Sequence, residues 1–441
     1  MVPMALRLLG LFALTLRAGS TAIGNGPKED EEEGSSSLLP PGTGGGTGTF
    51  RHGKFTGQRK RTTWRDLSQR NYTFSFEQYL SEYGKAYSRL DEYATRKATF
   101  DDELRAIAAH NNDPRRTWKK GLNEHTDKSE AEWKAMRGYN RLIAEPPSTL
   151  VTTGSDAAAG TATSNKTTSL GQLPASVDWR ERSNVVTPVK NQFGCGSCWA
   201  FSAAQSIESN VALNTGTLMY LSPQELVDCV PNPRDCGGTG GCDGATQVIA
   251  FNWASQNGLA QESLGYAKSH GLPANDAYTY TAQTGTCERK VDAVVGIKGF
   301  VHLPSNQYAP LLRAVAEEGP VSISVADASW KSYEEGVFDG IDGKCEDEHG
   351  TTISHAVQLV GYGSEGGADY WLVRNSWGTS WGEEGYMKLR RFGEGKEPCG
   401  TDFDPAAGSG CKGGPSQVRV CGLCGMLSDS SYPTGGYVGN K

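Results

Sequence analysis

The chain has 441 residues, of which 37% are hydrophobic and 21% are charged, and its formal net charge is −7 at pH 7. This size allows about three domains, while the acidic balance argues against a nucleic-acid partner. Beyond the amino-terminal leader, no segment is apolar enough to cross a bilayer, which needs about 20 such residues in a row.

Residues 1–22 predict a secretory signal peptide. Arg7 precedes a short apolar run at 8–16, and small residues follow at 18–22. A membrane-spanning signal anchor is the alternative, but the run is well short of the about 20 apolar residues that a span requires. We therefore expect the chain to enter the secretory pathway.

Residues 23–72 predict a disordered, low-complexity spacer. An acidic run at 29–33 gives way to a glycine-rich stretch and then to a basic stretch at 54–65. With so few apolar side chains, this part cannot bury a core. The basic stretch could serve sorting or nucleic-acid binding, but it has no evident folded partner, so a solvated tail is the favoured interpretation.

Residues 73–140 predict a small domain with two amphipathic helices, because apolar residues recur there at helical spacing. These residues are Phe74, Phe76, Tyr79, Leu80, Tyr83, Tyr93, Phe100, Leu104 and Ile107. One stripe on the second helix also includes Glu92 and Arg96, which are spaced to pair. Residues 141–172 are rich in Ala, Thr, Ser, Gly and Pro and predict an exposed, cleavable linker. Asn71 and Asn165 begin N-glycosylation motifs.

Residues 173–441 are organised around the stretch 192–201, Gln-Phe-Gly-Cys-Gly-Ser-Cys-Trp-Ala-Phe. After Cys198, large apolar residues near helical spacing, with alanines between them, predict a central buried helix. A thiol at the first turn of a helix feels the positive end of its dipole, which favours the thiolate. Cys198 is therefore a candidate nucleophile.

The cysteine spacing allows two other interpretations. Cys195 and Cys198 have the spacing of a redox motif, and Cys421 with Cys424 could add a second zinc knuckle. The redox motif should follow a strand in a small α/β unit, and zinc knuckles rarely lie more than about two hundred residues apart. We therefore expect no metal and no cofactor.

A base and a residue to orient it can be found downstream. His355 begins a β-branched run that ends in glycines and predicts a strand. Asn375 ends a second predicted strand and has Trp371, Trp377 and Trp381 near it in sequence. A buried amide among aromatic side chains needs a hydrogen-bond partner.

With these motifs the chain resembles the papain-like cysteine peptidases, specifically the cathepsin L-like branch. The resemblance implies that Cys198 is the nucleophile, His355 the acid and base, Asn375 its orienter and Gln192 an oxyanion donor. It also implies an α+β fold of two lobes, one helical and one β-rich, with the cleft between them. Strands expected at 291–301, 321–325, 355–361 and 370–374 fit that fold.

The resemblance extends to residues 74–139. The stripe that contains Glu92, Arg96, Phe100, Ile107 and Asn111 is similar to the family's propeptide signature. The stretch 121–127 is similar to a second propeptide element, with His125 where the family has phenylalanine. The resemblance thus implies a helical inhibitory propeptide domain, and loops at 264–277 and 392–423 exceed the family's usual length.

All 11 cysteines lie at or after Cys195, and without the nucleophile an even number remains. The resemblance implies the disulfides Cys195–Cys242, Cys229–Cys287 and Cys345–Cys424. Cys236, Cys399, Cys411 and Cys421 allow three pairings, among which the sequence does not choose.

The same resemblance implies a pocket for the substrate side chain two residues before the cut. Its expected substrate-binding residues are Gly244, Ala245, Thr246, Ser324, Ile353, Trp377 and Asp429. Asp429 falls at the base, where a carboxylate would pair with an incoming arginine or lysine. The alternative is that Asp429 faces solvent and the pocket takes aliphatic side chains only.

The expected function is that of a cysteine endopeptidase, made as a zymogen and activated in acid by removal of the propeptide. An inactive binding or inhibitory protein and a Cys-His-Asn acyl transferase are the rivals. Expected partners are protein and peptide substrates, the chain's own propeptide and cystatin-type inhibitors, with no nucleic acid and no membrane span. We expect a monomer in a lysosome-like acidic compartment or outside the cell.

Overall fold

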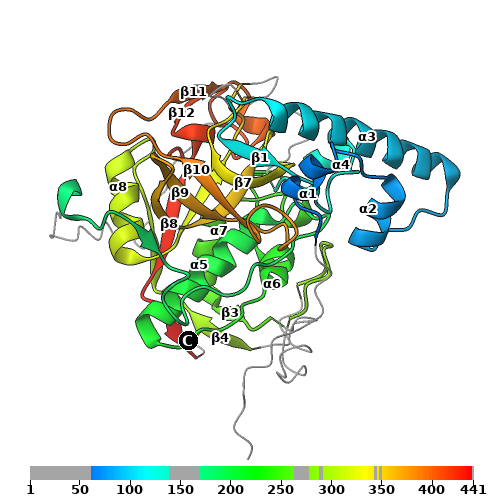
Figure 1. Ribbon diagram of the computed structural model, residues 1–441. Coiled ribbons are helices and arrows are strands. Elements are labelled where there is room, and N and C mark those ends of the chain that lie inside the picture. The colour runs from blue at the N-terminus through cyan, green and yellow to red at the C-terminus, as the bar shows by residue number, and fades with distance from the viewer. Residues whose placement is uncertain are drawn as a thin grey trace, which may run out of the picture. The chain divides into compact units, whose positions relative to one another are not determined.

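The structure is a computed structural model that describes residues 61–138, 169–262, 278–287, 292–341, 345–346 and 350–439. All of these residues belong to one compact unit, Arg59–Lys441. The expected signal peptide, Asn165, the linker up to residue 168 and the long loop at 264–277 lie outside the described residues. The fold is α+β, as the sequence predicts (Figure 1).

The amino-terminal part of the described chain contains four helices and one strand: α1 Trp64–Gln69, α2 Phe76–Tyr83, α3 Leu90–Asn112, β1 Trp118–Lys120 and α4 Glu130–Ala135. The helices α2 and α3 are the two that apolar spacing predicts. Their inward faces build a core of their own that includes Phe76, Tyr79, Phe100 and Ile107. Arg96 of α3 lies 3.6 Å from Glu92 and 2.5 Å from Glu132 of α4, so it ties the third helix to the fourth.

The expectation of a disordered spacer up to residue 72 is wrong for residues 61–72, which are ordered around α1. Thr63 and Asp66 form a capping box, and Leu67 is fully buried in the helical core. The basic stretch also has a folded partner, because Arg61 pairs with Glu334 and Arg65 with Glu335. The sequence could not reveal these acidic partners, which lie about 270 residues away.

The catalytic part begins with a helical lobe around α5 Cys198–Thr215, α6 Pro223–Cys229 and α7 Gln247–Asn257. Most of α5 is buried, from Trp199 and Phe201 to Val211, because α6, α7 and the sheet all pack against it. This explains why alanine and serine fill the positions between its large apolar residues. The helix is thereby fixed at the centre, and so is its first residue, Cys198.

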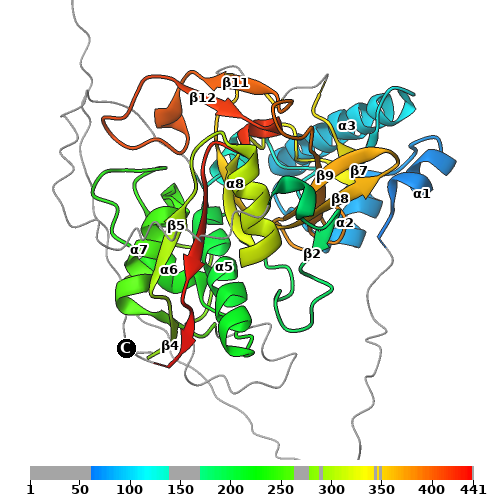
Figure 2. The same cartoon turned by 90° about the vertical axis from the view of Figure 1, so that its left-hand side faces the viewer.

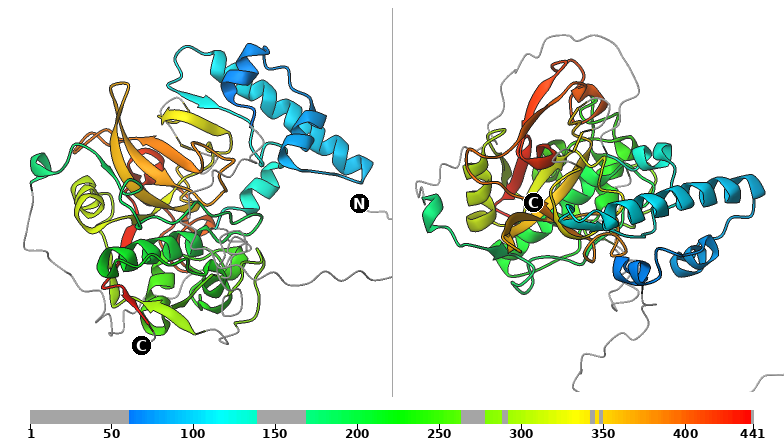
Figure 3. Two further views of the ribbon diagram at one scale, coloured as in Figure 1. Left: turned by 60° about the horizontal axis from the view of Figure 1, so that its bottom comes forward. Right: turned by 45° about the horizontal axis from the view of Figure 1, so that its top comes forward.

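The main sheet of the described chain has nine strands, in the order β1-β7-β10-β9-β8-β6-β13-β5, with β2 paired to β8. Its strands after β1 are β2 Val177–Asp178, β5 Gly299–His302, β6 Val321–Val325, β7 Tyr333–Phe338, β8 His355–Glu365, β9 Ala368–Arg374, β10 Tyr386–Arg390 and β13 Ser430–Thr434. Strand β1 pairs antiparallel with β7, with Trp118 opposite Gly336, so the amino-terminal domain extends the sheet at its edge. Figure 3 shows the blue and cyan helices of that domain on the same side as β7.

The expected strand at 291–301 divides in two. Strand β4 Ala293–Gly296 joins a three-stranded sheet with β3 Leu259–Ala260 and β14 Tyr437–Val438, whereas β5 joins the main sheet. The strands predicted at 321–325, 355–361 and 370–374 correspond to β6, β8 and β9. Short helical turns complete the fold: α8 Tyr308–Arg313, η1 Leu170–Gln172, η2 Gly241–Asp243, η3 Ala314–Glu318, η4 Pro405–Ala407 and η5 Leu423–Gly425.

The long segment 392–423 forms a hairpin of β11 Cys399–Asp402 and β12 Val418–Cys421, visible beside each other in Figure 2. A disulfide joins Cys399 to Cys421 across the hairpin, and a second joins Cys236 to Cys411. These are the two pairs that the sequence left open. The structure also contains the disulfides Cys195–Cys242, Cys229–Cys287 and Cys345–Cys424.

Within the described residues, no helix combines the length and the apolar character needed to cross a membrane.

Candidate active site

Cys198 is the first residue of α5 and is fully buried. It is the free cysteine of the described chain, since the other ten form disulfides. Its Sγ accepts a hydrogen bond of 3.2 Å from the backbone N–H of Ala356, the residue after His355. The strand β8 and the helix α5 therefore meet at the sulfur.

Burial raises the pKa of the Cys198 thiol to about 12, although the backbone N–H groups of Ala356 and Gly138 act in the opposite direction. The negative charge of Asp327 raises it further. Burial by the covering chain thus works against the thiolate that the start of a helix favours.

His355, at the start of β8, and Asn375, just after β9, are both fully buried and joined by a hydrogen bond of 2.8 Å between Nε2 and Oδ1. Asn375 Oδ1 also accepts from the Ser376 N–H, so the oxygen faces the histidine and Nε2 must carry the proton. No hydrogen-bond partner of His355 Nδ1 exists among the described residues. This nitrogen can therefore accept a proton or a hydrogen bond.

The ring of His355 stacks on Trp377, with centroids 4.6 Å apart and planes 23° apart. Burial lowers the pKa of His355, while Asp327 and the Asn375 hydrogen bond raise it. Arg137 adds to the lowering. Burial therefore disfavours the charged forms of both Cys198 and His355.

Hydrogen bonds fix the orientation of the Gln192 side-chain amide. Its Oε1 accepts from Ser376 Oγ at 2.6 Å, and its Nε2 donates to the Cys195 carbonyl at 2.9 Å. The same Nε2 donates at 2.7 Å to the carbonyl oxygen of Met136, a residue of the amino-terminal domain. The amide is therefore held with its donor toward a peptide carbonyl.

The backbone of residues 136–138 passes directly over these groups. A Cβ atom on Gly138 would overlap Cys198 Sγ and lie 2.9 Å from the Gly196 carbonyl, so only glycine fits. The Gly138 carbonyl accepts from the Ala245 N–H at 3.2 Å. The segment thus hydrogen-bonds through its main chain on both sides of the sulfur.

Sequence reasoning missed the pair formed by Arg137 and Asp327. The Arg137 Nε lies 3.3 Å from Asp327 Oδ1, and both side chains are buried. Asp327 Oδ1 also accepts from Ser354 Oγ, which precedes His355 in the chain. An aspartate two residues after a strongly apolar strand was the available signal, but nothing in the sequence connects it with residue 137.

Of the expected pocket residues, Ser324 contacts Asp429 directly, and Gln247 and His302 complete the group around this carboxylate. Oδ2 of Asp429 accepts from Gln247 Nε2 at 2.8 Å and from Ser324 Oγ at 2.6 Å, and Oδ1 lies 2.9 Å from His302 Nε2. Gly244 and Ala245 lie under the Gly138 carbonyl, and Thr246 caps α7. Ile353 is buried, and its N–H donates to Asp402 Oδ2 of the hairpin.

Hydrogen bonds from His302, Ser324 and Gln247 lower the pKa of Asp429, although burial raises it more than any one of them lowers it. In return, the hydrogen bond to Asp429 raises the pKa of His302. The carboxylate is therefore ionised and already has a cationic neighbour in acid, which the sequence did not suggest.

Trp377 packs against an aromatic group of the amino-terminal domain. Trp133 lies across it at 4.6 Å, and His125 lies 5.7 Å from Trp133 and 6.2 Å from Trp377. His125 is 1% exposed, and burial lowers its pKa well below the usual value. It is thus a neutral ring in an aromatic environment, as suits a position where a phenylalanine was expected.

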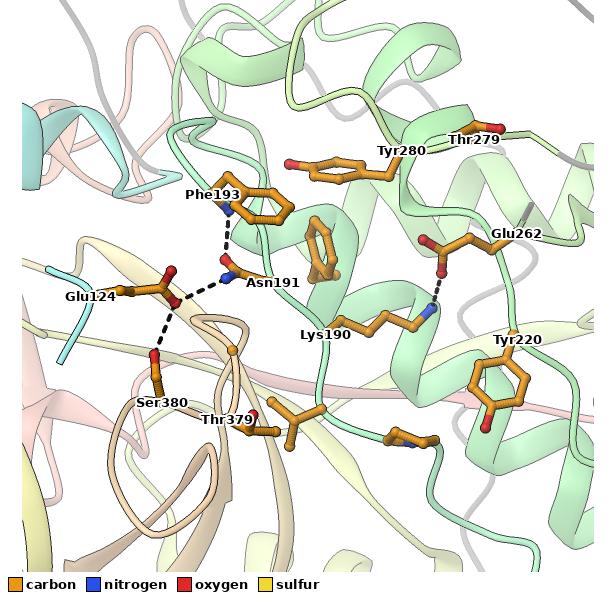
Figure 4. A pocket seen from close by; sticks show the side chains of 14 residues that line it. Glu124, Lys190, Asn191, Phe193, Tyr220, Glu262, Thr279, Tyr280, Thr379 and Ser380 are labelled. Carbon is orange, nitrogen blue, oxygen red and sulfur yellow. Dashed lines mark hydrogen bonds and ion pairs between the residues drawn. The ribbon is translucent and has the colours of Figure 1, made fainter. Parts of the chain in front are cut away.

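A separate cavity of about 500 Å³ lies behind the Gln192 turn and does not include Cys198 (Figure 4). Phe193 and Tyr280 border it, and Glu124 of the amino-terminal domain bonds there to Asn191 and Ser380. Tyr280 donates to the Gln192 carbonyl at 2.8 Å. The cavity thus adjoins the back of the site.

The arrangement holds an open acceptor, a thiol and two main-chain or amide donors around a bound peptide backbone. That set suits nucleophilic attack on a peptide carbonyl. Among the described residues, no group of three His, Cys, Asp or Glu side chains is placed to hold a metal ion.

Comparison with known families gives two matches. Residues 173–408 match the model of the papain family cysteine proteases, and residues 76–133 match the cathepsin propeptide inhibitor domain.

Individual relatives support the same assignment. The chain is 36% identical to pro-cathepsin H of Bos taurus over 330 residues, which are 74% of this chain and 87% of the relative. It is 33% identical to the senescence-specific cysteine protease SAG39 of Oryza sativa subsp. japonica, with 81% and 89% covered. Among solved structures, a recombinant stem bromelain precursor aligns with a TM-score of 0.58, 30% identity and coverage of 83% and 98%. The digestive procathepsin L 3 of Tenebrio molitor larval midgut aligns with a TM-score of 0.58, 28% identity and coverage of 83% and 99%.

Proposed function

The chain belongs to the papain family of cysteine proteases and carries the family's propeptide inhibitor domain, and from this premise we propose that it is an endopeptidase whose catalytic residues are Cys198, His355, Asn375 and Gln192. The inhibitor domain makes the chain a zymogen.

The proposed reaction begins with transfer of the thiol proton of Cys198 to Nδ1 of His355. The thiolate attacks the substrate carbonyl carbon, and the resulting oxyanion accepts hydrogen bonds from Gln192 Nε2 and the Cys198 N–H. His355 then gives its proton to the leaving amine, and a thioester remains on the sulfur. Water, deprotonated by the same nitrogen, hydrolyses the thioester.

One observation carries this proposal: residues of the proposed catalytic site are already hydrogen-bonded to a peptide backbone. Gln192 Nε2 donates a hydrogen bond of 2.7 Å to the Met136 carbonyl. The Gly138 N–H donates a hydrogen bond to the Cys198 sulfur. A binding protein that had lost the chemistry would not need an unpartnered His355 Nδ1 in a buried site. No observation on the described residues favours an acyl transferase.

The propeptide is proposed to leave in acid, with cleavage between residues 139 and 173. In the covered state burial disfavours the charged forms of Cys198 and His355, since it raises one pKa and lowers the other. Once water enters, both shifts should shrink, and the thiolate–imidazolium pair becomes accessible.

Endopeptidase action, rather than stepwise removal of dipeptides, is proposed because no paired histidines occur in the long loop at 264–277, which contains only His270. We further propose entry into the secretory pathway, an acidic compartment or the cell exterior as destination, and a monomeric state. The ten disulfide-bonded cysteines support an oxidising environment.

The test is to express the proenzyme, acidify it and sequence both the new amino terminus and the peptides cut from a long unfolded protein. We expect a new terminus between residues 139 and 173 and internal cuts at many positions. The Cys198→Ala variant should give neither. Removal of dipeptides in strict succession would contradict the endopeptidase assignment.

A further inference from the structure

Asp327 is a buried carboxylate beside the proposed catalytic residues, and its cationic partner comes from the propeptide. Its side chain is fully inaccessible, and Oδ1 accepts from Ser354 Oγ and lies 3.3 Å from Arg137 Nε. No hydrogen-bond partner of Oδ2 exists among the described residues. The Arg137 side chain is itself only 7% exposed, although arginine is rarely buried without a reason.

The position of its partner Arg137 relative to the sulfur shows on which side of the cleft Asp327 lies. Gly138, which lies over Cys198, gives its carbonyl to Ala245, on the side of the pocket that contains Asp429. Arg137 and Met136 continue away from Ala245, toward Gln192, and Trp133 lies on Trp377. Asp327 is therefore on the opposite side of the sulfur from Ala245, where the leaving part of a substrate would lie.

Removal of the propeptide takes away the partner of this carboxylate. Among the described residues, Ser354 would remain as the one side chain that hydrogen-bonds to it. The carboxylate then keeps one neutral donor, and a guanidinium or ammonium group of a substrate would restore the charged pairing that Arg137 provides in the zymogen.

We propose that Asp327 is a specificity-determining residue that selects arginine or lysine immediately after the cleaved bond, and that Arg137 occupies this place in the zymogen. The proposal rests on the endopeptidase function proposed above. It differs from the Asp429 pocket, which lies on the other side of the cut and has its own partners, His302, Gln247 and Ser324.

A different role for Asp327 leads to a different result. Its charge raises the pKa of His355, so it could act only by stabilising the imidazolium. In that case its loss would slow cleavage of every substrate equally and move the acid limb of the pH profile. Selection of a basic residue predicts instead a change in the ratio between substrates.

The experiment uses the acid-processed enzyme and two internally quenched peptides that differ only in having Arg or Leu directly after the cut. For the parent we expect kcat/KM to favour Arg by about tenfold, the typical value of a hydrogen-bonded charge pair. Asp327→Asn keeps the shape of the side chain and should reduce this ratio to about one. With a third peptide that has Glu at the same position, Asp327→Lys should reverse the preference, so that the Glu peptide is cleaved faster than the Arg peptide.

The matched control is Asp369→Asn, which removes a half-exposed carboxylate of β9 that pairs with Arg391 and should leave the Arg-to-Leu ratio after the cut unchanged. Cleavage of the Leu peptide by each variant reports the endopeptidase function separately from the role of Asp327. Equal slowing of both peptides in Asp327→Asn, with the ratio preserved, would overturn the proposal while the proposed function stands.

Discussion

The backbone of Gly138 lies against the sulfur of Cys198 so closely that a Cβ atom at residue 138 would overlap it. The side-chain amide of Gln192 donates to the Met136 carbonyl, the Ala245 N–H donates to the Gly138 carbonyl, and both bonds hold this segment in place. Inhibition in the zymogen is therefore explained by a short stretch of backbone without a side chain at its centre.

Gly138→Ala should release this segment, because the new methyl group has no space between Cys198 and Gly196. We expect the unprocessed chain to hydrolyse a fluorogenic peptide at pH 7, where the parent proenzyme is inactive. Gly171→Ala is the control, since a Cβ there meets nothing within 4 Å. A silent, full-length Gly138→Ala proenzyme would show that the segment is not held as described.

His125 should make the zymogen sensitive to acid. Burial lowers its pKa well below the ordinary value, and the charges of Lys128 and Lys85 lower it further. The docked domain therefore resists protonation, whereas a released His125 binds a proton near pH 6.5. Its contribution to docking is present above that pH and is lost as the pH falls below it.

His125→Phe should thus move the midpoint of acid activation down by about 0.5 to 1 pH unit. The measurement is the fraction of processed chain after a fixed time across a pH series. Lys97→Gln serves as the control, because Lys97 pairs with Asp101 on the surface of α3. An unchanged midpoint in His125→Phe would show that protonation of this histidine does not contribute to acid activation.

The His302–Asp429 pair should make the pocket before the cut depend on pH. The hydrogen bond to Asp429 raises the pKa of His302, so the imidazolium persists above pH 6.5 and partly neutralises the carboxylate. The preference for Arg over Leu two residues before the cut should therefore be small at pH 5 and increase as the pH rises through that pKa.

Fluorogenic peptides with Arg or Leu at that position, assayed at pH 5 and pH 8, test this pocket. His302→Gln should raise the Arg-to-Leu ratio of kcat/KM at pH 5 and flatten its pH dependence. Asp429→Ala should abolish acceptance of Arg at both values. If the ratio is the same in Asp429→Ala and in the parent, the carboxylate does not contact the substrate.

Gln192→Ala should reduce kcat by about 100- to 1000-fold, the usual effect of removing one oxyanion donor. Ser376→Ala should cost only about fivefold, because it removes one of the bonds that orient the Gln192 amide. Ser380→Ala, whose described partner is Glu124 of the propeptide, is the control. Equal rates for Gln192→Ala and the parent, with both proteins folded, would place the oxyanion elsewhere.

The sequence predicts the catalytic part of the fold well because its signals are local. Apolar spacing after Cys198 gives α5, and the β-branched runs at His355 and before Asn375 give β8 and β9. The motif also leads to Cys198, His355, Asn375 and Gln192, and the structure joins His355 to Asn375 by a hydrogen bond and brings the neighbouring Ala356 N–H to the sulfur. Their hydrogen bonds, however, depend on Ser376 and Ala356, which no pattern singles out.

What the sequence does not predict involves partners far apart in the chain. The sequence alone favours a solvated tail for Arg61 and Arg65. Their partners Glu334 and Glu335 lie far away in the sequence and come close only when the chain folds. Arg137 with Asp327 and His302 with Asp429 are pairs of the same kind. Charge pairs across the fold have no sequence period, so local pattern cannot detect them.

The most direct test of the central claim is the reactivity of Cys198 toward a thiol-reactive epoxide, before and after acid processing. The account predicts no labelling of the intact proenzyme at pH 7, since residues 136–138 cover the sulfur. After processing, one epoxide per chain should be found by mass spectrometry, on Cys198 alone, with loss of peptide hydrolysis. Labelling of the intact proenzyme at the same rate, or of a different residue in the processed enzyme, would contradict it.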